Sequence, residues 1–423
     1  MRDRYCRRTV LFFLLVFGLV FAFGSVSLAA TRNITVGSDY DVINAVIQSA
    51  DEGDTILFED GTYNLTGSIR VQISGLTLQS QTRGGAKLYQ DGYTIFEIDD
   101  GCAITIDGFY MGTVNVNDYN GILHNGGAPS GPVTITNNEL VGFDYSIEAL
   151  FDTASQVLTI TGNTFRNCNE GPYLSVEGWT VNISDNVFED CDYGIEIGSS
   201  GPTFGSENVQ ITGNTITASA GSECSYGIYL EDAGGGATVE ISGNTIEGDY
   251  EYGIYFEAIG TDGTNRSTTR VEKNRISVTG IGMYFEDLFE NAPGELTVRR
   301  NTLEGNNYGI KVNNFGALAN DSQTEILFTE NNIEGNWFGF QNAGNGVVIN
   351  AENNWWGDAS GPTHDDNPGG SGDTVSDSVD YDPWLGSAWE EDDDSSSGCN
   401  AGILNPLFLL LLAPLGLLLR KSR

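Results

Sequence analysis

The phrase apolar-x-apolar-x-x-Asn-x-apolar recurs along the middle of the chain and decides its fold. The copies read VTITNNEL (133–140), LTITGNTF (158–165), VNISDNVF (181–188), VQITGNTI (209–216), VEISGNTI (239–246), TRVEKNRI (269–276), LTVRRNTL (296–303), ILFTENNI (326–333) and INAENNWW (349–356). Alternating apolar runs this short cannot bury their apolar face alone, whereas stacked copies form a continuous core. The repeat therefore predicts stacked coils of about 25 to 30 residues each.

A second phrase follows most copies and adds a second strand to each coil. It reads YGIEI from Tyr193, YGIYL from Tyr226, YGIYF from Tyr252, YGIKV from Tyr308 and FGFQN from Phe338. We interpret the repeated Asn as scaffold, because its side chain tolerates a left-handed turn and stacked copies about 4.8 Å apart form an amide ladder. Two earlier segments, SGLTLQS (74–80) and CAITIDGF (102–109), follow the same rhythm. The total is about ten or eleven coils.

These repeats resemble those of the pectin-lyase-like superfamily, including its nitrous-oxide-accessory and carbohydrate-hydrolase types, over most of residues 33–385. The resemblance implies an all-β fold, a single-stranded right-handed parallel β-helix. The segment ITVGSDYDVINAVIQSADEGDTILFEDGTYNL is similar to the family's N-terminal cap, in which a helix, here over Val42–Ala50, plugs the open end. The ending NNWWGDASGPTHDDNPGGSGDTVSDSVDYDPWL resembles the terminal cap, which protects strand edges from pairing.

The chain ends carry signals for export and anchoring. Residues 1–30 have basic residues, an apolar run and small residues in the order of a signal peptide, and residues 31–385 form the repeat domain. An acidic and Ser-rich linker follows over 386–402, and then a hydrophobic tail with a basic end over 403–423. The tail resembles a bacterial C-terminal sorting signal of the Synergist type, which implies processing at Gly398 and Cys399; the alternative is a single membrane span. Both place the protein at the cell surface or outer envelope.

The charge balance limits the partners. Asp and Glu outnumber Lys and Arg by 58 to 19, a formal net charge of -39. Such a surface repels the phosphates of nucleic acids and anionic lipids, so no nucleic-acid partner is expected. It suits Ca²⁺, neutral or cationic partners, or simply solubility. The chain has only two His, so no imidazole metal site is expected.

Aligned second strands place tyrosines in one outward row. The fourth position of the phrase reads Tyr229, Tyr255 and Tyr284 on successive coils. Stacked rings suit the apolar faces of sugars, although stacked aromatics also stabilise β-helices without any ligand. We therefore name these tyrosines as the candidate substrate-binding residues for a polysaccharide or surface glycan.

Carboxylates occupy the sixth position of the same strands. These are Glu231, Glu257 and Glu286, followed by Asp232 and Asp287 in two of them. Like charges on adjacent coils repel, so such groups take a raised pKa, bind a cation or extend into water. The glutamates are the candidate catalytic residues if the protein cleaves glycans, and Asp232 and Asp287 are the candidate Ca²⁺ ligands.

Other polar groups favour structural interpretations. Lys273, Arg275, Arg299 and Arg300 offer the basic groups of a polysaccharide lyase, but acidic neighbours on adjacent coils favour ion pairs. Cys168, Cys191 and Cys224 are expected to be stacked, either as a disulfide or as an inward thiol column. The sequence thus predicts a surface β-helix that binds a polysaccharide and either cleaves it as a lyase or hydrolase or leaves it intact. The alternatives are an adhesin, a spacer or a Ca²⁺-stabilised structural protein.

Overall fold

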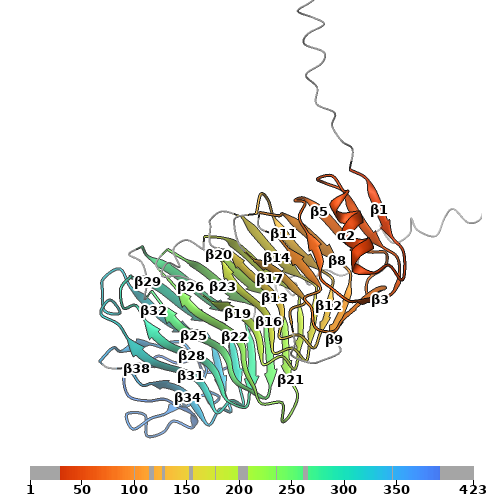
Figure 1. Cartoon of the computed structure of the whole chain (residues 1–423). Coiled ribbons are helices and arrows are strands. Elements are labelled where there is room, and N and C mark those ends of the chain that lie inside the picture. Colours follow the sequence, from red (N-terminus) through yellow and green to blue (C-terminus); the bar gives the residue numbers. More distant parts are fainter. Residues whose placement is uncertain are drawn as a thin grey trace, which may run out of the picture. The chain divides into compact units, whose positions relative to one another are not determined.

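The chain winds into coils whose strands stack in three long parallel sheets, here called sheets A, B and C (Figure 1). The computed structural model describes residues 29–390 apart from 100, 114–118, 126–128, 152–155, 177, 199–207, 235, 261–264 and 345. Neighbouring strands within a sheet come from successive coils and run parallel. The predicted parallel β-helix is confirmed, and eleven strands in each of sheets B and C agree with the expected number of coils.

The strands of sheet A carry the first phrase of each repeat. They are β1 (Thr31–Ile34), β2 (Thr55–Phe58), β5 (Leu76–Ser80), β8 (Ile104–Asp107), β11 (Val133–Thr136), β14 (Val157–Thr161), β17 (Thr180–Ser184), β20 (Asn208–Thr212), β23 (Thr238–Ser242), β26 (Ser267–Glu272), β29 (Gly294–Arg299), β32 (Glu325–Thr329), β35 (Ile349–Asn350) and β38 (Val379–Asp380). Those of sheet B follow the Asn turn and are β3 (Gly61–Leu65), β6 (Ala86–Gln90), β9 (Tyr110–Thr113), β12 (Glu139–Val141), β15 (Thr164–Arg166), β18 (Val187–Glu189), β21 (Thr215–Ala218), β24 (Thr245–Gly248), β27 (Arg275–Val278), β30 (Thr302–Glu304) and β33 (Asn332–Glu334).

The strands of sheet C carry the second phrase, which begins with Tyr-Gly in four coils. They are β4 (Ile69–Val71), β7 (Phe96–Ile98), β10 (Ile122–Asn125), β13 (Tyr145–Phe151), β16 (Glu170–Val176), β19 (Tyr193–Gly198), β22 (Cys224–Ala233), β25 (Tyr250–Ile259), β28 (Ile281–Leu288), β31 (Tyr308–Phe315) and β34 (Phe338–Asn342). A small sheet of β36 (Pro362–Thr363) and β37 (Gly372–Thr374) belongs to the C-terminal cap.

The buried Asn residues form the predicted ladder. All nine repeated Asn residues are at most 1% exposed: Asn138, Asn163, Asn186, Asn214, Asn244, Asn274, Asn301, Asn331 and Asn354. Nδ2 of Asn244 donates to Oδ1 of Asn274 at 2.9 Å and to the carbonyl of Ile211 at 2.8 Å. The scaffold role is confirmed, but the expected left-handed conformation falls one residue earlier, as at Asp185 (φ 54°) and Lys273 (φ 55°). The turn is made before the Asn, which leaves its amide pointing into the coil.

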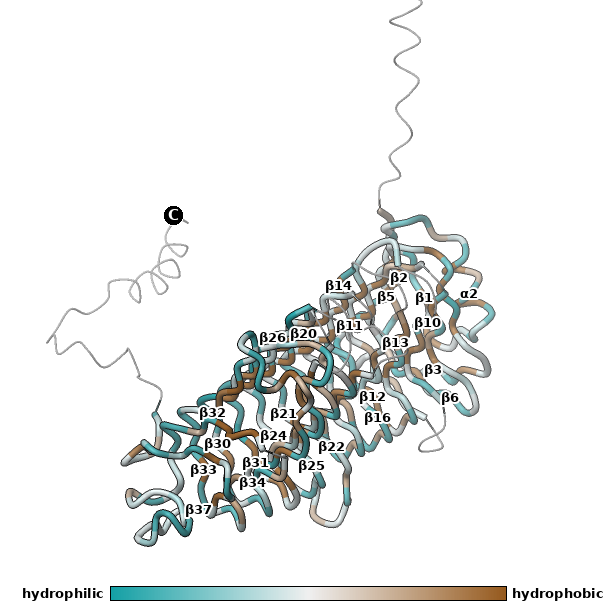
Figure 2. The backbone as a smooth tube through the Cα atoms, turned by 90° about the vertical axis from the view of Figure 1, so that its left-hand side faces the viewer, coloured by the Kyte–Doolittle hydropathy of each residue, from teal (hydrophilic) through white to brown (hydrophobic). Residues whose placement is uncertain are grey.

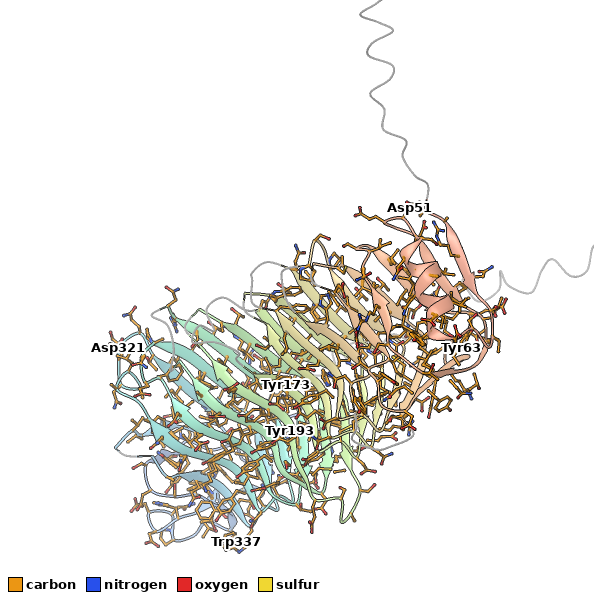
Figure 3. All side chains as sticks on the ribbon, viewed as in Figure 1. Asp51, Tyr63, Tyr173, Tyr193, Asp321 and Trp337 are labelled. Carbon is orange, nitrogen blue, oxygen red and sulfur yellow. The ribbon has the colours of Figure 1, made fainter. Side chains whose placement is uncertain are left out.

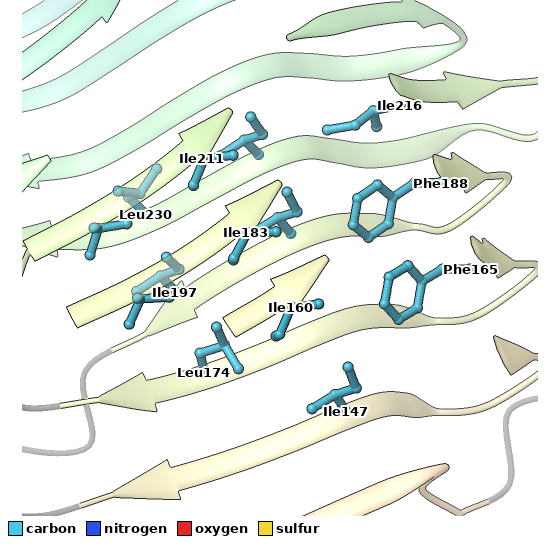
Figure 4. Close-up of a cluster of buried hydrophobic side chains, with 14 of the residues drawn as sticks. Ile147, Ile160, Phe165, Leu174, Ile183, Phe188, Ile197, Ile211, Ile216 and Leu230 are labelled. Atoms are coloured by element: carbon cyan, nitrogen blue, oxygen red, sulfur yellow. The ribbon is translucent and has the colours of Figure 1, made fainter. Parts of the chain in front are cut away.

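The core repeats from coil to coil, so that like side chains stack on like (Figure 4). Phe165 and Phe188, from β15 and β18, lie with ring centroids 4.7 Å apart and planes within 7°. In the same coils sheet A contributes Ile160 and Ile183, which are completely buried. Figure 2 shows the apolar positions returning along successive strands. A repeated sequence thus fills a solenoid core with identical layers.

A short helix covers the first coil. Helix α2 (Tyr40–Gln48) begins two residues before the predicted helix because Asp39 caps it, accepting a hydrogen bond from the backbone N–H of Val42 at 3.1 Å. Its Ile43 and Ile47 are completely buried. The predicted plug is therefore present.

The segments expected to direct export and anchoring are outside the described part of the chain. Nearly all of the predicted signal peptide lies there, and so do Gly398 and Cys399, the predicted sorting residues, and the hydrophobic tail. Among the residues that the structure describes, no helix has the length and apolarity needed to cross a membrane.

Candidate functional site

The three candidate tyrosines form one row on the outer face of sheet C. Strand pairing aligns Tyr229 with Tyr255 and Tyr255 with Tyr284. The ring centroids are 5.3 Å apart in the first pair and 5.1 Å in the second. Tyr255 and Tyr284 are only 8% and 9% exposed, so neighbouring side chains cover much of this row.

A second tyrosine row, at the first position of the phrase, provides much of that cover. It contains Tyr193, Tyr226 and Tyr252, all half-buried. The ring of Tyr226 lies 5.2 Å from that of Tyr252 with planes within 11°. Rings of the two rows meet edge to face, as between Tyr252 and Tyr255 at 5.0 Å. The sequence contained this row in its repeated Tyr-Gly, but only the fourth and sixth positions were considered as outward.

Two tyrosines of the first row, the row of Tyr229, Tyr255 and Tyr284, are hydrogen-bonded to the predicted glutamates. The hydroxyl of Tyr229 donates to Glu257, and that of Tyr255 donates to Glu286. Burial raises the pKa of both tyrosines, and the hydrogen bond to a carboxylate raises it further, so both stay protonated donors. Glu257 is exposed, whereas Glu231 and Glu286 are half-buried. The hydroxyls and carboxylates together form a polar edge beside the rings.

The aromatic surface continues to the C-terminal coils. The Lys311 ammonium lies 5.5 Å from the Tyr284 ring centroid and 5.6 Å from that of Tyr308. Beyond it, Trp337 is 72% exposed and its ring lies 5.8 Å from that of Tyr308. Figure 3 shows Tyr173 and Tyr193 over the central coils and Trp337 near the far end. We call this surface, from Tyr145 to Trp337, the aromatic face of sheet C.

The carboxyl pair with the largest perturbation is one that the sequence reasoning missed. Glu170 in β16 and Glu196 in β19 interact across neighbouring coils, and the Oε2 atom of Glu170 is buried. Burial, and then the charge of Glu196, raises the pKa of Glu170 to about 9; burial also raises the pKa of Glu196. The pair therefore holds one shared proton near neutral pH. Glu170 lies in the same column as Tyr145 and Tyr193, which was the available signal.

The candidate Ca²⁺ ligands are not adjacent. Asp232 pairs with Ala258, which pairs with Asp287, so a whole coil separates the two aspartates. The side chain of Asp232 lies outside the described residues. Within the described part of the chain, no group of three or more His, Cys, Asp or Glu is placed to hold a metal ion.

The three arginines considered for a lyase are engaged in ion pairs away from sheet C. Arg275 in sheet B bridges Glu247 at 3.4 Å and Glu304 at 2.9 Å. Arg299 in sheet A pairs with Glu272 at 3.0 Å, and Arg300 pairs with Glu330 at 2.7 Å. The predicted ion pairs of these arginines are confirmed, whereas strands β10 to β28 of sheet C contain no Lys or Arg.

A regular parallel solenoid with an amide ladder defines a β-helix repeat protein. Comparison with protein families finds a match over residues 47–219 and 100–314 to a family described as periplasmic copper-binding protein (NosD). The chain belongs to this family, which agrees with an exported β-helix protein. No curated protein matches the chain.

The family description raises the question of which residues could hold copper. His124 is buried beside the Cys102 carbonyl, at 2.9 Å, and His364 lies in the C-terminal cap, so the imidazoles are in separate coils. Cys168, Cys191 and Cys224 are buried and form no disulfide. Of the two predicted alternatives, the structure has the inward thiol column. Thiolates are ligands that monovalent copper prefers, so the sulfur column is the donor set that fits the metal.

Proposed function

We propose that this exported β-helix binds a neutral or cationic polysaccharide along the aromatic face of sheet C. The observation that carries the proposal is the double tyrosine row, in which the hydroxyls of Tyr229 and Tyr255 donate to carboxylates. Aromatic rings offer flat apolar surface to sugar rings, and the polar edge supplies acceptors for sugar hydroxyls.

The charge on this face favours one class of glycan over another. Glu148, Glu170, Glu196, Glu231 and Glu257 lie on strands without Lys or Arg. A polyuronate would bring further negative charge to these carboxylates, at a cost that low salt increases. A neutral glycan avoids this cost, and an amino sugar polymer gains attraction.

The geometry favours binding over cleavage. Glycosidases hold their two carboxyl groups about 5 Å or more apart, which leaves room for the scissile bond. Glu170 and Glu196 act on each other as a coupled pair on neighbouring coils, which is not the arrangement of two carboxyl groups on either side of such a bond. Cleavage of a glycan that is lost in Glu257→Gln would contradict this part of the proposal.

The binding test uses the purified protein with chitosan, a neutral glucan and polygalacturonate, each with and without Ca²⁺. We expect chitosan or the glucan to bind and polygalacturonate not to bind. Tyr252→Ala should weaken binding about tenfold, equivalent to about 1.4 kcal/mol. Tyr89→Ala is the matched control, because its ring centroid lies 5.5 Å from that of Tyr110 in sheet B, away from the aromatic face of sheet C. Unchanged affinity in Tyr252→Ala, with the fold intact by circular dichroism, would refute the site.

A further inference from the structure

Three cysteines stack at the corner between sheets B and C. Cys168, Cys191 and Cys224 come from successive coils and are 3%, 0% and 5% exposed. The Tyr250 hydroxyl, from the next coil, donates to the carbonyl of Cys191 at 3.2 Å. Coils stacked at about 4.8 Å bring such side chains into contact with their neighbours. The core therefore contains a column of three neighbouring thiols at this corner, not one isolated buried cysteine.

The first two thiols are neighbours across the coil stack. Strand pairing sets Glu170 beside Tyr193, so Cys168 and Cys191, each two residues earlier, lie beside each other. The backbone N–H of Asp192 donates to the carbonyl of Cys168 at 3.2 Å, which continues the hydrogen bonding between these coils through the corner. Both thiols are buried, and Sγ of Cys168 lies 3.3 Å from the carbonyl oxygen of Arg166.

A pocket connects this column to solvent. Its volume is about 570 Å³, and its lining includes Cys168, Cys224, Asp190, Asp192 and the loop 219–225. The loop is held by carboxylates, since Asp249 accepts from the backbone N–H of Gly221 at 2.7 Å and Asp192 from that of Ser225 at 2.7 Å. A mouth with these carboxylates attracts cations rather than anions.

The sulfur donors select the kind of cation. Ca²⁺ and Mg²⁺ prefer oxygen, and Zn²⁺ takes four ligands in structural sites, whereas soft Cu(I) is satisfied by two thiolates. We propose that Cys168 and Cys191 bind one Cu(I) ion between their sulfurs, with Cys224 as the neighbouring sulfur at the pocket. Binding forms two Cu–S bonds and releases the thiol protons to solvent, and copper stays Cu(I) throughout. The proposal is independent of glycan binding, which uses other residues.

The test is a competition titration of the reduced protein, under anaerobic conditions, with Cu(I) bound to bicinchoninate. We expect one Cu(I) per chain to leave the chelator and thiolate-to-copper absorption to appear in the near ultraviolet. Cys168→Ser and Cys191→Ser should each weaken binding by more than the roughly 10–100-fold typical of losing an outer-shell partner. Cys102→Ser is the matched control, because this buried thiol lies outside the column and should leave the affinity unchanged.

A second measurement keeps the proposal testable if a serine variant fails to fold. Alkylation of the unmodified protein, mapped by mass spectrometry, should label Cys168 or Cys224 slowly through the pocket, and Cu(I) should block the labelling. Equal Cu(I) affinity in the Cys168→Ser/Cys191→Ser double variant would overturn the proposal. A Cys168–Cys191 disulfide in protein isolated from the export compartment would also overturn it, because the donor pair would then be consumed.

Discussion

Replacing Glu170 with Gln should stabilise the folded protein, and the gain should grow with pH. Burial, and then the charge of Glu196, raises the pKa of Glu170 to about 9. The folded protein thus keeps a proton that the unfolded chain releases near the ordinary glutamate pKa of about 4.3. The stability that this proton supplies is complete below that ordinary pKa and is lost as the pH rises through about 9. A glutamine at position 170 stays neutral at every pH, so the variant does not lose this contribution to stability.

The size of the stability gain follows from the pKa shift of Glu170 and from how far its carboxyl group is exposed to solvent. One pKa unit corresponds to about 1.4 kcal/mol, but solvent and salt screen a carboxyl that is only partly buried. We therefore expect Glu170→Gln to add about 1 to 3 kcal/mol at pH 8 and close to nothing at pH 4. The Gln amide can also replace the shared proton by donating to Glu196.

Urea unfolding at pH 4, 6 and 8 would measure this difference. The matched control is Glu251→Gln, which removes one negative charge from an exposed position on sheet C. If the two variants gain equally at pH 8, the effect is general charge relief and the reasoning about a shared proton is wrong. A gain over the parent protein that does not grow between pH 4 and pH 8 would refute it as well.

Two further predictions concern the scaffold. Asn244→Ala should lower the free energy of unfolding by about 3 to 5 kcal/mol, because it leaves the buried donors of Asn214 without their acceptor, while the exposed Asn320→Ala should change it by less than about 0.5 kcal/mol. Gly253→Ala should lower the free energy of unfolding by about 1 to 3 kcal/mol, because a Cβ there would lie 2.6 Å from the Gly282 carbonyl oxygen, whereas Gly369→Ala meets nothing within 4 Å. Urea unfolding measures both pairs, and equal stability of a variant and its control would contradict the corresponding prediction.

The regular spacing of the repeat is what made much of the site predictable. The repeated second phrase fixed the register of the sheet C strands, so the alignment of Tyr229, Tyr255 and Tyr284 followed from the sequence. The same counting predicted the cysteine column. The burial of Tyr255 and Tyr284 was not predictable in this way, because it depends on how rings from two rows tilt against each other.

The Glu170–Glu196 pair was missed for a related reason. The coil at 170–176 reads EGPYLSV and lacks the Tyr-Gly phrase, so it was never aligned with its neighbours. Its place became clear only from strand pairing, which sets Glu170 beside Tyr193 and Tyr173 beside Glu196. Glu170 and Glu196 therefore occupy different positions on neighbouring strands and approach each other diagonally. Aligning equivalent positions of successive coils does not predict such diagonal contacts.

The distribution of charge is the strongest argument for the proposal that sheet C, rather than the other two sheets, binds the ligand. Stacking carboxylates on adjacent coils has an electrostatic cost wherever it occurs. Sheets A and B relieve that cost with arginines, as Arg275 does between Glu247 and Glu304. From β10 to β28, sheet C relieves it instead with tyrosine hydroxyls and a shared proton. An arginine is a fixed internal partner, whereas hydroxyl donors and protons are groups that a sugar hydroxyl or amine can replace, so this face is the one where a ligand can take over the compensation.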